Sequence, residues 1–119
     1  MASYSQVAEI TATAGAPRLL YIAGQSGHNA SGKLADGVAE QADQCFANIA
    51  GVLKGMGLTT NDLVKINVYL TSRDHLAGYR VARDKALGSI QPSSTLVIVQ
   101  ALAGPDMKVE IEAVAASAA

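Results

Sequence analysis

The chain has 119 residues, of which 50% are hydrophobic and 16% charged, and its formal net charge is −1. This length and composition predict one domain over residues 1–119 and exclude a disordered chain. The balanced charge offers no basic stripe for a nucleic acid. The single cysteine excludes an internal disulfide and a thiolate metal site, and its two histidines lie far apart. We predict a soluble cytoplasmic protein, because the sequence shows neither an apolar run long enough to span a membrane nor a signal-peptide pattern.

The side chains are unusually small for a folded domain. The chain contains 22 alanines but only five aromatic residues, four Tyr and one Phe. Small side chains bury little area each, so such a chain gains stability by burying surface against copies of itself. The composition therefore favours an oligomer.

The first part of the chain predicts a β-hairpin followed by a loop. Ser5–Thr13 alternates with a period of two, and Arg18–Ala23 is a short apolar run, so both are expected to be strands. Gly15–Pro17 between them is a turn. Gly24–Leu34 contains several turn-forming residues and predicts a loop.

Two amphipathic helices are predicted next. The first covers Asp36–Lys54, with Asp36 as its N-cap and Gly55 as part of its stop signal, and the second covers Thr71–Leu87. The apolar positions that mark their buried sides are Val38, Ala42, Cys45, Phe46, Ile49 and Leu53 in the first helix, and Leu76, Tyr79, Ala82, Ala86 and Leu87 in the second. Cys45 lies within its stripe and is therefore predicted to pack rather than react.

Three more strands complete the prediction. Leu63–Leu70 alternates, with Lys65, Asn67 and Tyr69 on its polar face, and Lys108–Val114 alternates as well. The element order ββαβαββ predicts an α+β fold, with two helices on one face of a mostly antiparallel sheet of five or six strands. Ser94–Leu102 is apolar on both faces, so the second face of the sheet is expected to be buried against another subunit.

The chemistry-bearing residues form no standard nucleophile motif. His28 is expected to be a loop residue rather than a base, and His75 to face solvent in the first turn of a helix. Glu110 and Glu112 share one face of the last strand. A half-buried carboxylate there could hold or deprotonate a water, or both could simply face solvent at an edge.

Five segments in chain order resemble the reactive-intermediate deaminases, the Rid or YjgF-like family. The first is Tyr4–Gln6, which resembles the family's opening Tyr-Ser-Gln. Leu20–Gln25 resembles its motif FVSGQ, and Leu63–Thr71 resembles VVKTTVYLTD. Ser94-Thr95, after Pro92, resembles part of PARST, and Val109–Val114 resembles VEIEAIA. The resemblance implies a chorismate-mutase-like homotrimer with sites in the clefts between subunits. It also implies hydrolysis of reactive enamines and imines to a carbonyl compound and ammonia, without a metal or organic cofactor.

The resemblance also assigns roles to particular residues. Glu110 falls on the family's water-holding acid. Thr95 falls where many members have a cysteine or threonine whose backbone carbonyl faces the same water. Tyr4 and Gly24 fall on positions that line the cleft.

One position departs from the family pattern. Ser93 stands where active members carry an arginine whose guanidinium clamps the substrate carboxylate. Arg80, at a position that is an asparagine in the best-known members, could reach a carboxylate from the other side. It could equally be a solvated helix arginine.

Three functions remain open from the sequence. The first is hydrolysis of an enamine or imine, with a substrate class altered by Ser93. The second is a trimer that binds a small metabolite without turnover, which the missing arginine favours. The third is a role with macromolecules, such as the ribonuclease or chaperone-like roles suggested for some relatives. The net charge and the few aromatic residues argue against nucleic acid, and no membrane partner is expected.

Overall fold

The structure, a computed structural model, describes residues 5–11 and 18–117. Its elements along the chain are β1 (Val7–Thr11), β2 (Arg18–Gln25), α1 (Val38–Gly55), β3 (Leu63–Leu70), α2 (Leu76–Leu87), β4 (Ser93–Ile98) and β5 (Val109–Ser117). Two short 3₁₀ helices, Thr60–Asp62 and Arg73–His75, precede β3 and α2. The predicted order ββαβαββ is confirmed, while the predicted turn at Gly15–Pro17 lies outside the described residues.

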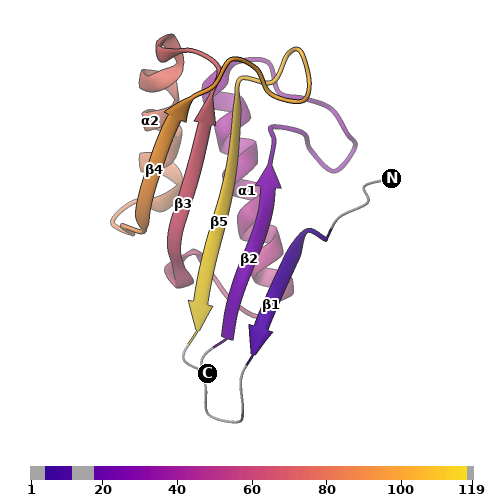
Figure 1. Ribbon diagram of the computed structural model, residues 1–119, viewed down its shortest axis with the longest axis vertical. Helices are drawn as coiled ribbons and strands as arrows, with labels where there is room; N and C mark the ends of the chain where they lie inside the picture. Colours follow the sequence, from indigo (N-terminus) through magenta and orange to yellow (C-terminus); the bar gives the residue numbers. More distant parts are fainter. Residues whose placement is uncertain (1–4, 12–17, 118–119) are drawn as a thin grey trace.

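The five strands form one mixed sheet in the order β1-β2-β5-β3-β4 (Figure 1). Every neighbouring pair is antiparallel except β3 and β4, which run parallel. A parallel pair needs a crossover connection, and α2 supplies it. Figure 1 shows both helices on the same side of the sheet, which confirms the predicted α+β fold.

The core lies between the sheet and the two helices. Its fully buried side chains come from alternate positions of β2, β3 and β5 and from one stripe of α1. The largest apolar ones are Leu20, Ile49, Leu53, Ile66, Leu70 and Ile111. Cys45 is also fully buried there, and its thiol donates to the Gln25 carbonyl oxygen at 3.2 Å. Burial raises the pKa of Cys45 to about 12, so the predicted packing role is confirmed.

Both ends of α1 differ from the prediction. Gly37, rather than Asp36, is the N-cap residue; it is extended and provides no side-chain cap. Its carbonyl oxygen instead accepts the Gln41 amide at 2.8 Å. Gly55 belongs to the helix, and the chain turns away at Gly57, whose φ of 76° is the left-handed conformation that glycine adopts without a steric penalty.

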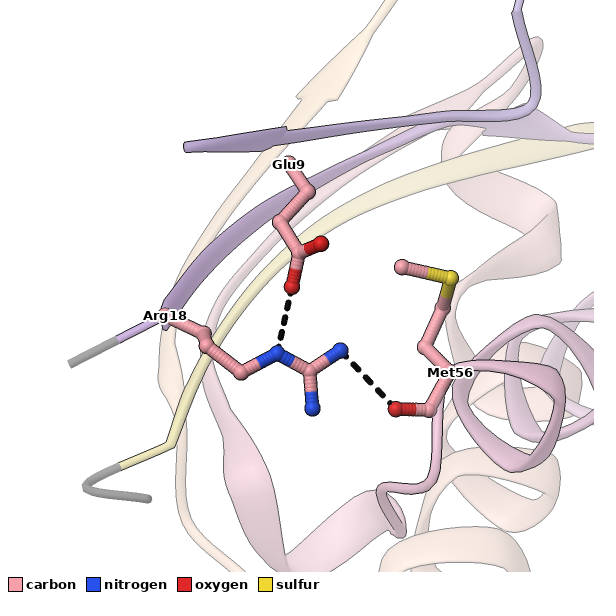
Figure 2. A network of polar contacts seen from close by, with 3 residues as sticks. All are labelled: Glu9, Arg18 and Met56. Atoms are coloured by element: carbon pink, nitrogen blue, oxygen red, sulfur yellow. Dashed lines mark hydrogen bonds and ion pairs between the residues drawn. The ribbon is translucent and has the colours of Figure 1, made fainter. Parts of the chain in front are cut away.

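Arg18 ties the β1–β2 hairpin to the C-terminal end of α1 (Figure 2). Its Nε donates to the carboxylate of Glu9 on β1. Its Nη2 donates to the carbonyl oxygen of Met56 at 2.9 Å, where a helix end leaves unpaired carbonyls and favours a positive charge. The hairpin is therefore fixed against the helix layer at this corner of the molecule.

Three further predictions are corrected. Gly24 and Gln25 extend β2 instead of opening the loop. Strand β4 ends at Ile98, so Val99–Leu102 is not strand. The chain leaves the sheet after the Val99 N–H donates a hydrogen bond to the Leu70 carbonyl oxygen at 2.8 Å. Ala86 is exposed on α2, since the helix turns this position away from the sheet.

Candidate functional site

The sheet has one face that no helix covers, here called the open face. Side chains alternate between the two faces along each strand, and residues paired across strands share a face, so the registers show which side chains point to the open face. On β1 and β2 they are mainly apolar, and on β3 they are polar; on β5 they are acidic at Glu110 and Glu112 and apolar at Val114 and Ala116. The open-face residues used below are Ile10, Tyr21, Lys65, Asn67, Tyr69, Thr95, Val97, Glu110 and Glu112.

Glu110 is a half-buried carboxylate at the start of β5. Its neighbours Val109 and Ile111 are fully buried against the helix layer, which turns Glu110 to the open face. Its carboxylate lies directly over Gly24, because a Cβ added at Gly24 would stand 2.5 Å from Glu110 Oε2. Only a residue without a side chain leaves this space. Gly24 also lies where the β2–β5 register shifts, between Ile22 and Gln25.

Burial raises the pKa of Glu110, and the nearby negative charge of Glu112 raises it further. Among the ion pairs of residues 5–11 and 18–117, none includes Glu110. Its carboxylate is therefore destabilised as an anion and has an increased tendency to take a proton. That is the property required of a general base that must accept a proton from water.

Tyr69 holds the second carboxylate in place. Its hydroxyl donates to Glu112 Oε1, and Asn67 Nδ2 approaches the same oxygen at 3.5 Å. The hydrogen bond to Glu112 raises the pKa of Tyr69, so the phenol stays protonated and remains a donor. Tyr69 is also the cross-strand partner of Glu110, so it stands beside both acids.

A hollow of about 480 Å³ lies on the open face next to this cluster. Tyr21 and Ala8 line its apolar side, and Lys65, Asn67 and Glu112 line its polar side. The hollow therefore combines an apolar wall with charges of both signs.

Thr95, Ser93 and Arg80, which the sequence also proposed for the site, lie apart from Glu110 in one protomer. Thr95 is on edge strand β4, with Lys65 Nζ 3.3 Å from its hydroxyl, and β3 stands between it and β5. Ser93 begins the same strand and donates to the Val64 carbonyl oxygen at 2.9 Å. Arg80 is exposed on α2, in the helix layer. Tyr4 lies outside the described residues. Among the predicted site residues that the structure describes, Gly24 alone adjoins Glu110 within one protomer.

Sequence reasoning missed a contact just beyond β2. Ser26 Oγ lies 2.6 Å from His28 Nδ1, although His28 was expected to be only a loop residue. Asn48 on α1 holds this segment, because its Nδ2 donates to the carbonyl oxygens of Ser26, at 3.1 Å, and His28, at 3.0 Å. The Ser-x-His spacing was the available signal, since residues two apart on an extended chain share a side.

Residues 5–11 and 18–117 contain no group of three or more His, Cys, Asp or Glu residues arranged to hold a metal ion. Within the same ranges, neither helix has the length and apolar character needed to cross a membrane.

Comparison with known proteins connects these features to a family. The family model described as Endoribonuclease L-PSP matches residues 1–117. Protein HMF1 of Saccharomyces cerevisiae is 32% identical over 117 residues, covering 97% of this chain and 84% of HMF1. The 2-iminobutanoate/2-iminopropanoate deaminase of Bos taurus is 36% identical over 100 residues, covering 82% of this chain and 72% of the deaminase. Some fungal relatives are named as mitochondrial proteins.

The fold comparison agrees. The crystal structure of RidA from the Antarctic bacterium Psychrobacter sp. superimposes with a TM-score of 0.85 at 31% identity, covering 96% of this chain and 88% of that one. The matches extend over almost the whole chain, and the sheet has the chorismate-mutase-like arrangement of the YjgF fold. The chain therefore belongs to the endoribonuclease L-PSP family, the family of YjgF and RidA.

Proposed function

We propose that this protein hydrolyses a reactive enamine or imine to a carbonyl compound and ammonia. The observation that carries the proposal is the carboxylate of Glu110, which is half-buried over Gly24 and has a raised pKa. Support also comes from the bovine relative, which is named as a deaminase of 2-imino acids. Neither a metal nor an organic cofactor takes part in this chemistry.

Glu110 acts on the attacking water. As the water oxygen bonds to the imine carbon, the carboxylate takes one of its protons, and the carbinolamine forms. The imine nitrogen takes a proton from solvent as the carbinolamine forms. The proton that Glu110 holds then goes to the departing nitrogen, the C–N bond breaks and ammonia leaves, while the carbinolamine hydroxyl gives its proton back to solvent and becomes the carbonyl oxygen. A base with a raised pKa suits this cycle, because it must both accept the proton and release it.

We propose that the site is completed in a homotrimer. The open face carries exposed apolar side chains, Ile10 and Tyr21 on one half and Val97 on the edge strand. In a trimer these side chains meet the neighbouring subunits, and Thr95 of one subunit approaches Glu110 of the next. The backbone carbonyl of Thr95 then helps to hold the water, while Tyr4 and Gly24 line the cleft. Sedimentation should give about three times 12.2 kDa; a monomer at micromolar concentration contradicts this assembly.

The substrate class is set by Ser93 and Arg80. A serine hydroxyl carries no charge, so it cannot clamp a carboxylate as a guanidinium does. We propose that Ser93 alters the substrate class, and that Arg80 faces the cleft from a neighbouring subunit. Ser93→Arg combined with Arg80→Asn should raise hydrolysis of 2-iminopropanoate, whereas Ser93→Arg alone brings two cations together.

The deciding experiment measures ammonia release from a panel of freshly generated imines. Glu110→Gln keeps the side-chain shape and removes the base, so turnover should fall by about two to four orders of magnitude. Asp106→Asn, an exposed acid before β5, is the matched control and should leave turnover unchanged. If Glu110→Gln leaves turnover intact, Glu110 is not the base. If the parent protein releases no ammonia from any imine of the panel, the alternative function, a trimer that binds a small metabolite without turnover, replaces the hydrolase.

A further inference from the structure

The segment after β2 alternates between the two sides of the sheet. A Cβ added at Gly27 would meet the Gln41 backbone at 2.7 Å, so Gly27 points toward α1. A Cβ at Gly24 would meet Glu110, so Gly24 points to the open face. Ser26 and His28 contact each other and alternate with Gly27. Their side chains therefore lie on the side of the sheet that carries Glu110.

The β2–β5 register, continued one residue past the end of β2, brings Ser26 next to Glu110. Gln25 is the partner of Ile111 in the antiparallel β2–β5 pair. β2 ends at Gln25, and continuing the same register one residue past that end and one residue back along β5 brings Ser26 opposite Glu110. Opposed residues of antiparallel strands have Cα atoms about 4.5–5.5 Å apart. The hydroxyl–imidazole pair thus adjoins the carboxylate proposed as the base.

We propose that Ser26 and His28 form a proton relay that serves the substrate nitrogen. This inference rests on the proposed hydrolase function and adds a second acid–base group to it. The Ser26 hydroxyl touches the substrate and is a catalytic residue, while His28 acts through Ser26. The class of substrate it suits is an imine whose nitrogen must be protonated as water attacks.

The relay balances the reaction. In the first step the water oxygen bonds to the imine carbon and Glu110 takes a water proton. The imine nitrogen takes the Ser26 hydroxyl proton, and protonated His28 replaces that proton through Nδ1. In the second step the C–N bond breaks, Glu110 returns its proton to the nitrogen, and the carbinolamine hydroxyl proton passes through Ser26 to His28. Water and imine become carbonyl compound and ammonia, and both groups return to their starting protonation states.

The backbone support of this pair is independent of the pair itself. Asn48 fixes the carbonyl oxygens of Ser26 and His28, and the Ala35 amide donates to the Gly27 carbonyl oxygen at 3.0 Å. Removing the Ser26 hydroxyl therefore leaves the segment hydrogen-bonded to Asn48 of α1 and to Ala35, which lies just before α1. This separation makes a chemical role distinguishable from a structural one.

The test compares Ser26→Ala and His28→Ala with matched controls elsewhere in the chain. Ser31→Ala changes an exposed loop serine, and His75→Ala changes the second histidine, which lies before α2. Each relay variant should lower kcat for ammonia release about a hundredfold, with KM little changed. The controls should keep the parent's kcat. Ser26→Thr retains a hydroxyl and should keep most of the activity.

Chemical rescue provides a readout that a structural role would not move. Added imidazole should restore turnover to His28→Ala and leave Ser26→Ala unchanged. The relay is wrong if Ser26→Ala and His28→Ala keep the parent's turnover while Glu110→Gln is inactive, and in that case the hydrolase function stands. It is also wrong if imidazole rescues neither variant and Ser26→Thr is as inactive as Ser26→Ala. Full turnover by Glu110→Gln rejects Glu110 as the base and with it the relay's reaction scheme, whereas no turnover of any imine by the parent protein rejects the hydrolase function and the relay together.

Discussion

On β5, Ile111 and Ala113 pack under α1, while Glu110 and Glu112, one position away along the same strand, point to the open face. The same backbone thus carries a dry, close-packed side and a polar side. The difference teaches how this fold positions an acid. Burial of the apolar residues fixes the register, and a slip by one residue would drive both carboxylates into the core. The covered face therefore provides the rigidity that the chemistry of the open face uses.

The largest expected effect concerns the reactivity of Cys45, the thiol buried on the covered face. Burial raises the pKa of Cys45 from 9.0 to about 12, so the native thiol has about a thousandfold less thiolate at neutral pH. A maleimide or disulfide reagent should label the native protein at least that much more slowly than the protein unfolded in denaturant. Rapid labelling of the native protein would show that the helix layer opens easily over this face.

The covered face should dominate stability. Ile111 is fully buried, so Ile111→Ala should lower the free energy of unfolding by about 2–5 kcal/mol. Glu112→Gln, on the opposite side of the same strand, should change it far less, since Tyr69 can still donate to an amide oxygen. Denaturant unfolding at one fixed protein concentration measures both, because assembly contributes to apparent stability. Equal losses for the two variants would contradict the contrast.

Gly24→Ala should break the open face while leaving the covered face intact. The new methyl group meets Glu110 Oε2 at 2.5 Å and forces the carboxylate to move. A displacement of about 1 Å can cost about a hundredfold in turnover, so ammonia release should fall by that order. Gly51→Ala is the control, because a Cβ there meets nothing within 4 Å. In the interior of α1 this change should stabilise the protein by about 0.5–1 kcal/mol and leave turnover unchanged.

The smallest expected effect is a shift in pH dependence. The negative charge of Glu112 contributes to the raised pKa of Glu110, so Glu112→Gln should lower that pKa. Since the base acts as a carboxylate, the acidic limb of the rate profile should move to lower pH. Ammonia release measured across the acidic range checks the sign. A shift to higher pH would mean that Glu112 does not act on Glu110 through its charge.

Local periodicity made much of this architecture predictable. Ile66 and Val68 alternate with Lys65 and Asn67, and this pattern places them on opposite faces of β3 as found. Strand ends were less predictable, because Val99 is as apolar as Val97 yet follows the point where β4 leaves the sheet. The acid Glu110 was found from its strand pattern and from the family resemblance. Its contact with Gly24 could not be predicted, because it depends on the β2–β5 register between residues far apart in sequence.

Gln41 connects the helix layer to both segments that lead into the candidate site. Its Nε2 donates to the carbonyl oxygens of Ala35, at 3.0 Å, and Asp106, at 3.1 Å, and its Oε1 accepts the Lys108 amide at 2.8 Å. The Lys108 amide is thus protected by a buried side chain of α1 rather than by a neighbouring strand. Its hydrogen-exchange rate therefore reports the free energy of breaking the contact between Gln41 and the segment that leads into β5.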